Sequence, residues 1–281
     1  MLKQRIITAL ILLAVLLAVL FYPLPWLFGA FMTLFMGAAS WEWARLSGYA
    51  APATWGWAVV AMLGCIAMLA LGWPVAQGGW PMLLMACCTL AWLLCAFVLL
   101  QQGVWVWQRM ARPVRMAGGL LALWAAWLAA VQLHGQFGVW YLLSVLSLVW
   151  VADIGAYFFG RALGKKKLAP TISPGKSWAG VWGGVGSVVV FAVLAVVFFP
   201  AVRHFYADLA QQGGWLVLTA VVVGMAALSV VGDLIESLMK RSMGMKDSSR
   251  LLPGHGGVLD RIDSILPILP LAVLAAQWLR A

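Results

Sequence analysis

Apolar runs of about 20 residues recur through this sequence, and few folds can accommodate them. A run of that length crosses a bilayer as an α-helix, because about 20 residues rising ~1.5 Å each cover a hydrocarbon core roughly 30 Å thick. Hydrophobic residues make up 65% of the chain, which excludes a soluble globular core and is typical of a polytopic membrane protein. We therefore predict an all-α fold, a polytopic integral membrane bundle of about nine transmembrane helices.

The apolar runs also predict where the spans lie. They cover residues 6–21, 26–44, 54–73, 80–100, 116–134, 138–160, 178–199, 214–239 and 264–279. The first resembles the apolar part of a signal peptide, but it lacks a small-residue cleavage site, so we interpret it as an uncleaved span. No long soluble insertion or internal repeat is evident, which predicts a single membrane domain over 1–281. Within it, residues 1–115 contain no motif, and residues 116–281 contain the functional spans and cytoplasmic loops.

The basic residues predict the orientation of the bundle. If the N-terminus is cytoplasmic, all 18 Lys and Arg residues except Arg203 and Arg280 lie on the cytoplasmic side. Cytoplasmic loops of membrane proteins are enriched in Lys and Arg, so this bias predicts a cytoplasmic N-terminus and a C-terminus outside. The same rule explains the formal net charge of +10, and nucleic-acid binding is therefore not predicted.

Charge is concentrated between residues 232 and 263. Five of the 8 acidic residues lie there: Asp233, Glu236, Asp247, Asp260 and Asp263. Among them lie five basic residues: Lys240, Arg241, Lys246, Arg250 and Arg261. Each of the pairs 233/236 and 260/263 is three residues apart, so each pair can share one helix face. Carboxylates can hold a metal ion and basic side chains a polyanion, so this cytoplasmic stretch predicts a site for both.

Two carboxylates fall inside predicted spans. Asp233 precedes Lys240 by seven residues and so lies roughly 10 Å into the membrane, and Asp153 precedes Gly160 by the same number. A carboxylate at that depth is expected to face the bundle interior and to be neutralised by a cation, a basic side chain or a proton. A buried ion pair that fixes helix packing is the alternative. We favour a metal, because Mg²⁺ binds through one or two carboxylates together with substrate phosphates.

Two loops contain residues suited to phosphate. The turn Pro253-Gly254-His255-Gly256-Gly257 can expose several backbone N–H groups, although Gly-rich turns often only reverse the chain. In the other loop, Lys165 to Lys167 is expected to anchor anionic lipid. Gly175-Lys176-Ser177 resembles a P-loop superficially, but Pro170 stands where that motif needs Gly and no strand is expected before it. Ser177 is expected to cap the following helix, and Lys176 either to sit at that cap or to reach a phosphate.

The charged stretch resembles the signature of a known family. Ser237, Lys240, Arg241, Lys246, Asp247, the Pro253 to Gly257 turn, Asp260, Arg261 and Asp263 match, position by position, the signature of phosphatidate cytidylyltransferases, or CDP-diacylglycerol synthases. The segments 153–161 and 173–180 are also similar, although Ala179 stands where the family commonly has an acidic residue. The resemblance covers roughly residues 150 to 264, and the first 115 residues match only in being hydrophobic.

The resemblance implies transfer of the cytidylyl group of CTP to phosphatidate, giving CDP-diacylglycerol and pyrophosphate, with Mg²⁺ and room for a second cation. The nucleophile is a phosphate monoester with a second pKa near 6, so it is largely dianionic and needs no general base. Catalysis should then consist of positioning and charge neutralisation. Such an enzyme would lie in a bacterial-type inner membrane with its site on the cytoplasmic side, and the resemblance also implies a possible homodimer.

The resemblance also implies roles for the residues. The metal ligands would be Asp233 and Asp260 first, with Glu236 and Asp263 as further candidates. The catalytic and phosphate-binding candidates are Lys240, Arg241, Lys246, His255, Asp260 and Arg261. The substrate-binding candidates are Asp153, Lys176, Ser237, Asp247, Gly256 and Gly257.

Three other functions fit parts of the sequence. A lipid transporter or flippase would also use buried carboxylates, but no internal repeat or paired broken helices are visible. A CDP-alcohol phosphotransferase should show a DGxxAR-type motif, which is absent. A purely structural subunit would not need five carboxylates around one basic loop. Consumption of CTP separates cytidylyl transfer from transport, which leaves CTP intact.

Overall fold

The computed structural model describes residues 2–280, without the side chains of residues 2–6, 9, 25, 99–102 and 104. The α-helices are α1 (Leu2–Phe21), α2 (Pro25–Leu46), α3 (Ala51–Ala70), α4 (Trp80–Gln102), α5 (Val104–Arg109), α6 (Arg112–Gln132), α7 (Val139–Leu163), α8 (Trp178–Phe198), α9 (Phe205–Ser242), α10 (Leu259–Ile262) and α11 (Ile268–Trp278). Short turns η1 (Trp73–Val75) and η2 (Leu133–Phe137) and strands β1 (Lys167–Ala169) and β2 (Ser173–Ser177) complete the chain. The charged side chains of Lys3 and Arg5, which entered the orientation argument, lie outside the described residues.

Helices occupy the positions of the predicted spans. Within the described residues, six helices are long and apolar enough to cross a membrane: α3, α4, α6 with its continuation to Phe137, α7, α8 and α9. Residues 10–21 of α1 and all of α11 are shorter apolar helices. The protein is therefore a helical membrane protein, as its composition predicts.

Helix α9 contains the start of the eighth predicted span. Its backbone leaves helical geometry at Gly214, where φ is 77°, so α9 consists of two helices joined at that residue. A positive φ of this size favours glycine, which has no β-carbon to clash. The short segment before the kink is capped by the His204 side chain, whose Nδ1 accepts the Ala207 N–H at 3.1 Å.

A small antiparallel sheet stands where the sequence predicted only a loop. β1 pairs with β2, with Lys167 opposite Ser177. The expectation that no strand precedes Gly175-Lys176-Ser177 was wrong, because β1 precedes this motif and the motif itself lies in β2, which runs directly into α8. Pro170 still excludes a P-loop. The predicted cap is confirmed, since Ser177 Oγ accepts the Gly180 N–H at 3.2 Å.

Helices α7 and α8 pack closely because small residues line their contact. A β-carbon on Gly180 would lie 2.9 Å from the Ala156 carbonyl oxygen, and one on Gly184 would lie 2.8 Å from that of Ala152. Small residues of this kind let membrane helices approach each other without a gap. Helix α9 packs against both, which brings α7, β2 and the later turns of α9 to one region.

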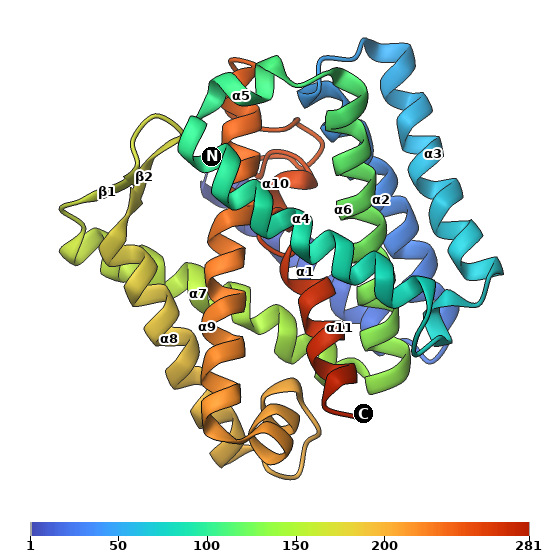
Figure 1. The fold of residues 1–281 in the computed structure, drawn as a ribbon, viewed down its shortest axis with the longest axis vertical. Helices are drawn as coiled ribbons and strands as arrows, with labels where there is room; N and C mark the ends of the chain where they lie inside the picture. Colours follow the sequence, from blue (N-terminus) through green and yellow to red (C-terminus); the bar gives the residue numbers. More distant parts are fainter. Residues whose placement is uncertain (1, 281) are drawn as a thin grey trace.

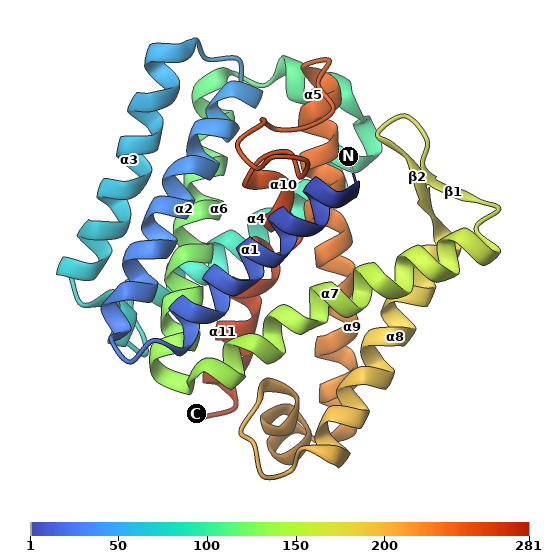
Figure 2. The same cartoon turned by 180° about the vertical axis from the view of Figure 1, so that it is seen from behind.

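Helix α9 runs through the middle of the molecule, with α2, α3 and α6 to one side and α8 to the other (Figure 1). The β1–β2 hairpin, α5 and the loop before α10 gather towards the same end as the N-terminus, whereas the C-terminus lies nearer the opposite end. From behind, α1 crosses the face formed by α10 and α11 and approaches α7 (Figure 2). Charged loops and the last turns of α9 thus meet at one end of an apolar bundle.

Candidate active site

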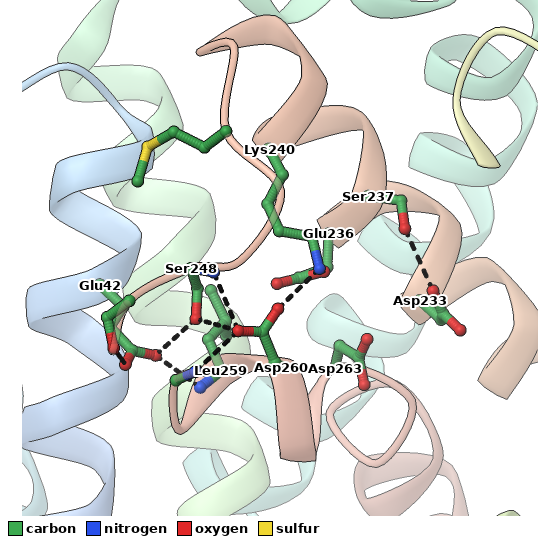
Figure 3. Close-up of polar contacts among 12 residues, drawn as sticks. Glu42, Asp233, Glu236, Ser237, Lys240, Ser248, Leu259, Asp260 and Asp263 are labelled. Atoms are coloured by element: carbon green, nitrogen blue, oxygen red, sulfur yellow. Dashed lines mark hydrogen bonds and ion pairs between the residues drawn. The ribbon is translucent and has the colours of Figure 1, made fainter. Parts of the chain in front are cut away.

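The first of two charged clusters lies where the last turns of α9 meet α10 (Figure 3). Lys240 forms ion pairs with Glu236, one turn earlier on α9, and with Asp260, whose Oδ1 lies 2.6 Å from Lys240 Nζ. Glu236 is buried, and Lys240 and Asp260 are nearly so. Two carboxylates therefore share one ammonium group in a setting with little solvent to screen them.

The other oxygen of Asp260 is held by the loop before α10. Oδ2 accepts the Ser248 N–H at 2.9 Å, the Ser248 hydroxyl at 2.8 Å and the Gly257 N–H at 2.8 Å. Burial alone would raise the pKa of Asp260, but its neighbours Glu236 and Lys240 and the Gly257 N–H lower it to about 2. Hydrogen bonds to the charged form are what stabilise it. Asp260 is thus an ionised carboxylate with a fixed orientation.

The second cluster joins α9 to the hairpin. Lys176 Nζ on β2 lies 2.6 Å from Asp233 Oδ2, and the Ser237 hydroxyl donates to Asp233 Oδ1 at 3.2 Å. Asp263 lies between the two clusters in Figure 3, and its Oδ1 accepts the N–H of Ser264 at 2.7 Å. The structure therefore places the four predicted carboxylates of positions 233, 236, 260 and 263 in one neighbourhood.

A polar cavity of about 560 Å³ adjoins the second cluster. Asp153 from α7 lines it together with three basic residues, Arg161, Lys167 and Lys176. Glycines of α7, β2 and α8 form much of the remaining wall, so backbone is accessible there. The cavity has the charge and the size to take a phosphate-bearing molecule.

The carboxylates suit a hard cation by their chemistry. Among the described residues, no group of three or more His, Cys, Asp or Glu side chains is arranged to hold a metal ion by itself. Mg²⁺ does not need such a group, since it binds through one or two carboxylates and completes its shell with phosphates and water. Buried Glu236 Oε1 lacks a hydrogen-bond partner, and Asp263 has no ion-pair partner within the described part of the chain. These oxygens fit a magnesium site completed by substrate.

Three signature residues are exposed to solvent. Lys246 and Asp247 are exposed and line a surface cavity of about 620 Å³ with Arg45 and Arg250. Arg241 is also exposed, and its guanidinium donates to the carbonyl oxygens of two residues, Ile172 and Met245, each at 3.4 Å. No hydrogen bond or ion pair joins the side chains of Arg241 and Lys246 to Asp260 within the described residues, whereas Asp247 lies close to it: a β-carbon on Gly256 would lie 3.5 Å from Asp247 Cβ and 2.6 Å from Asp260 Oδ2.

Sequence reasoning missed Glu42, a fully buried carboxylate on α2. It accepts four hydrogen bonds from the signature loop and the start of α10: from the hydroxyls of Ser248 at 3.1 Å and Ser249 at 2.5 Å, and from the N–H groups of Val258 at 3.0 Å and Leu259 at 2.6 Å. Ser248 also contacts Asp260, so Glu42 supports the loop that holds that carboxylate (Figure 3). The available signal was that Glu42 is the only acidic residue before Asp153.

The paired glycines of the signature have a packing role. A β-carbon on Gly257 would lie 2.1 Å from Ser248 Oγ and 2.2 Å from Glu42 Oε1, and one on Gly256 would lie 2.6 Å from Asp260 Oδ2. Gly256 also has a φ of 81°. These residues let the chain fold tightly around two carboxylates. The family resemblance also implies that Gly256 and Gly257 approach the nucleotide directly, and this stays a prediction.

Replacing Gly257 by Ala should therefore displace Glu42 and Ser248. We expect a lower melting temperature, corresponding to about 1–3 kcal/mol of overpacking, together with reduced activity. Gly224→Ala on α9 is the matched control, because a β-carbon there meets nothing within 4 Å. Equal melting temperatures for the two variants in detergent would contradict this packing role.

Two other signature residues line a third region. His255 and Arg261 line an apolar cleft of about 430 Å³ beside α1. The signature thus divides between a carboxylate cluster, a surface cavity and a cleft.

Residues 3–279 match the Cytidylyltransferase family. The chain belongs to this family.

Two relatives align with almost the whole of this cytidylyltransferase family member. It is 43% identical to a phosphatidate cytidylyltransferase of Pseudomonas aeruginosa over 99% of both chains. It is 35% identical to a phosphatidate cytidylyltransferase of Haemophilus influenzae over 96% of both chains. A Staphylococcus epidermidis protein of the same name is 44% identical over 48% of both chains.

The comparisons confirm the family resemblance and extend it. The match begins at residue 3, so the first 115 residues belong to the family in more than hydrophobicity, which corrects the narrower range of 150 to 264. Ala179, the departure from the family pattern, lies on α8 and lines an apolar groove between α7 and α8. It does not line the polar cavity, although its neighbours Ser177 and Gly180 do.

Proposed function

We propose that this cytidylyltransferase transfers the cytidylyl group of CTP to phosphatidate. A phosphate oxygen of the lipid bonds to the α-phosphorus of CTP, the bond between that phosphorus and the bridging oxygen breaks, and pyrophosphate leaves. The products are CDP-diacylglycerol and pyrophosphate. The observation that carries this proposal is the cluster of carboxylates and lysines at one end of an apolar bundle. The chain is also similar, over 99% of its length, to a protein named for this reaction.

Charge is the main obstacle in this reaction, because a dianion must approach an anionic nucleotide. Arg161, Lys167 and Lys176 give the polar cavity a cationic wall suited to the triphosphate of CTP. Lys176 and Lys240 can exchange a carboxylate oxygen for a phosphate oxygen by small side-chain rotations. These residues position the reactants and neutralise charge, and none of them needs to remove a proton.

A magnesium ion is part of the proposal. Asp233 and Asp260 would hold it first, and Glu236 and Asp263 are further ligands or would hold a second cation. When bound with CTP, the ion would neutralise charge on the phosphates and on the leaving pyrophosphate. Asp260 is suited to this role because its hydrogen bonds fix both its ionisation and its direction.

The proposed enzyme spans a bacterial-type inner membrane nine times, with its N-terminus and its site on the cytoplasmic side. The distribution of Lys and Arg supports this orientation. CTP would then reach the site from the cytosol, and phosphatidate from the adjoining leaflet. A cysteine introduced near the N-terminus should be labelled only from the cytoplasmic side of intact vesicles, and labelling only from the outside would refute the orientation. A homodimer is proposed by family analogy, and the mass of the purified protein tests it.

Product analysis tests the reaction itself. Purified protein in detergent, given CTP, phosphatidate and Mg²⁺, should form a lipid with the mass of CDP-diacylglycerol, and a chelator of divalent cations should stop its formation. Intact CTP combined with movement of phosphatidate between vesicle leaflets would instead support a lipid transporter.

A further inference from the structure

The cleft that contains His255 and Arg261 has no role in the proposed reaction so far. It measures about 430 Å³ and lies among α1, α2, α6, α7 and the segment from α10 to α11. Apart from these two residues, its lining consists of aliphatic, aromatic and methionine side chains, such as Leu16, Met32 and Trp150. A cavity with long apolar walls and a polar end suits an amphiphile.

The lining of the cleft leads towards the reacting groups. On α7, Leu142, Leu146 and Trp150 recur every four residues and line the cleft. Asp153 follows three residues later, on the same side of the helix by helical periodicity, and lines the polar cavity. On α10, Arg261 stands between Asp260 and Asp263 in the sequence. The polar end of the cleft is therefore adjacent to the carboxylate cluster.

The polar end of the cleft contains side-chain nitrogen atoms that form no hydrogen bond with other described side chains. Arg261 is exposed, and its guanidinium forms no ion pair or hydrogen bond with the described residues, although its backbone N–H donates to the Val258 carbonyl oxygen. His255 Nδ1 is buried and likewise lacks a partner within the described part of the chain. An arginine and a histidine that line the same otherwise apolar cleft match a phosphate monoester attached to acyl chains.

We infer that this cleft binds an acyl chain of phosphatidate and places the lipid phosphate against Arg261 and His255. The inference rests on the proposed function and adds the location of the lipid substrate. The phosphate then lies on one side of α10, and the cationic cavity proposed for CTP lies beyond Asp153. The two substrates approach the carboxylate cluster from different sides, as an in-line attack requires.

Another groove provides a useful contrast. It measures about 790 Å³ and lies between α7 and α8, with Phe159, Trp182 and Leu194 in its wall. No charged residue lines it, so it has no group to receive a phosphate. By this comparison the cleft beside α1 is the better site for a charged lipid.

Helix α1 forms the wall of the cleft nearest the bilayer. It packs against α2, and Thr8 donates a hydrogen bond to the Pro253 carbonyl oxygen at 2.9 Å in the signature loop. Leu12 and Leu16 line the cleft, whereas Leu10 is 60% exposed and does not. Substitutions at Leu16 and at Leu10 can therefore distinguish an effect on the cleft from an effect on the outer surface of the same helix.

The test compares Leu16→Trp with Leu10→Trp in the purified full-length protein. Both variants are assayed with CTP and with one of two phosphatidates, whose acyl chains have about sixteen or about six carbons. The two lipids differ in the length of apolar chain that the cleft must hold. Leu16→Trp should raise the KM for the long-chain lipid roughly tenfold, the loss expected when about two methylene groups leave an apolar site. The KM for CTP and the KM for the short-chain lipid should stay unchanged, and Leu10→Trp should behave like the wild type.

A binding measurement accompanies the kinetics and needs no turnover. Phosphatidate with a photoreactive acyl chain should label peptides of α1 and α7 in the wild type, and excess unlabelled phosphatidate should prevent this. Labelling of α8 instead, or equal effects of the two substitutions on both lipids, would overturn the inference. Failure of the wild type to consume CTP with either lipid would refute the proposed function, while the labelling pattern would still decide where the lipid binds.

Discussion

Replacing Asp260 by Asn should abolish turnover, with a loss on the order of 10³-fold in kcat. The substitution removes the negative charge that pairs with Lys240 and halves the acceptor capacity of a side chain that receives three hydrogen bonds through one oxygen. Asparagine has the same shape, so the loop and α10 should keep their places. The loss should therefore appear as reduced pyrophosphate release by a protein that still elutes as a single folded species.

The matched control for Asp260→Asn is Asp208→Asn. Asp208 also forms an ion pair with a basic residue, Arg203, at 3.0 Å, but it lies at the start of α9 on the other side of the bundle. Partly exposed pairs of this kind contribute about 0–1 kcal/mol, so this variant should keep its activity. Near-normal activity of Asp260→Asn would refute the role of Asp260 as a metal ligand.

Replacing Glu42 by Ala should have the second largest effect. The change leaves the N–H groups of Val258 and Leu259 and the Ser249 hydroxyl without the acceptor that Glu42 provides, in a part of the molecule that is buried, whereas the Ser248 hydroxyl keeps Asp260 as its acceptor. Each stranded donor costs about 1–3 kcal/mol, so we expect a marked fall in melting temperature. Activity should fall as well, because Ser248 joins Glu42 to Asp260. Thermal unfolding in detergent and pyrophosphate release measure the two effects.

Two further variants separate positioning from general stability. Glu42→Gln keeps the side-chain volume, but its NH₂ group must face the backbone N–H of either Val258 or Leu259. The melting temperature and the activity of this variant should therefore lie between those of Glu42→Ala and those of the wild type. Ser40→Ala, also on α2, removes a buried hydroxyl that donates to Trp57, and should cost roughly 1 kcal/mol without lowering kcat. If Glu42→Ala matched Ser40→Ala in both measurements, Glu42 would not position the loop.

The positions of the membrane helices could be predicted from sequence because the signal is local. A run of about 20 apolar residues identifies a span without reference to any partner, and residues 138–160 and 178–199 correspond closely to α7 and α8. The hairpin was missed because its sequence contains no such local signal. Its residues, 167–177, include two Lys, two Pro and one Gly, which have low strand propensity, so the local sequence does not indicate the pairing of β1 with β2.

The candidate site was predictable only in part. Glu236 and Lys240 lie one helical turn apart, so their contact follows from spacing, whereas the contact of Glu42 joins residues more than 200 positions apart. Loop residues such as Lys246 belong to the signature, but sequence alone does not fix their direction, and the structure places this lysine in the surface cavity. His255 and Arg261 similarly face a cleft whose walls come largely from helices outside the signature.

The most direct test of the central claim is pyrophosphate release by the detergent-purified protein with CTP, phosphatidate and Mg²⁺, measured beside Asp260→Asn. The account predicts release that requires all three components, equals the CDP-diacylglycerol formed, and disappears in the variant. A folded wild type that leaves CTP untouched under varied lipid and cation conditions would contradict it.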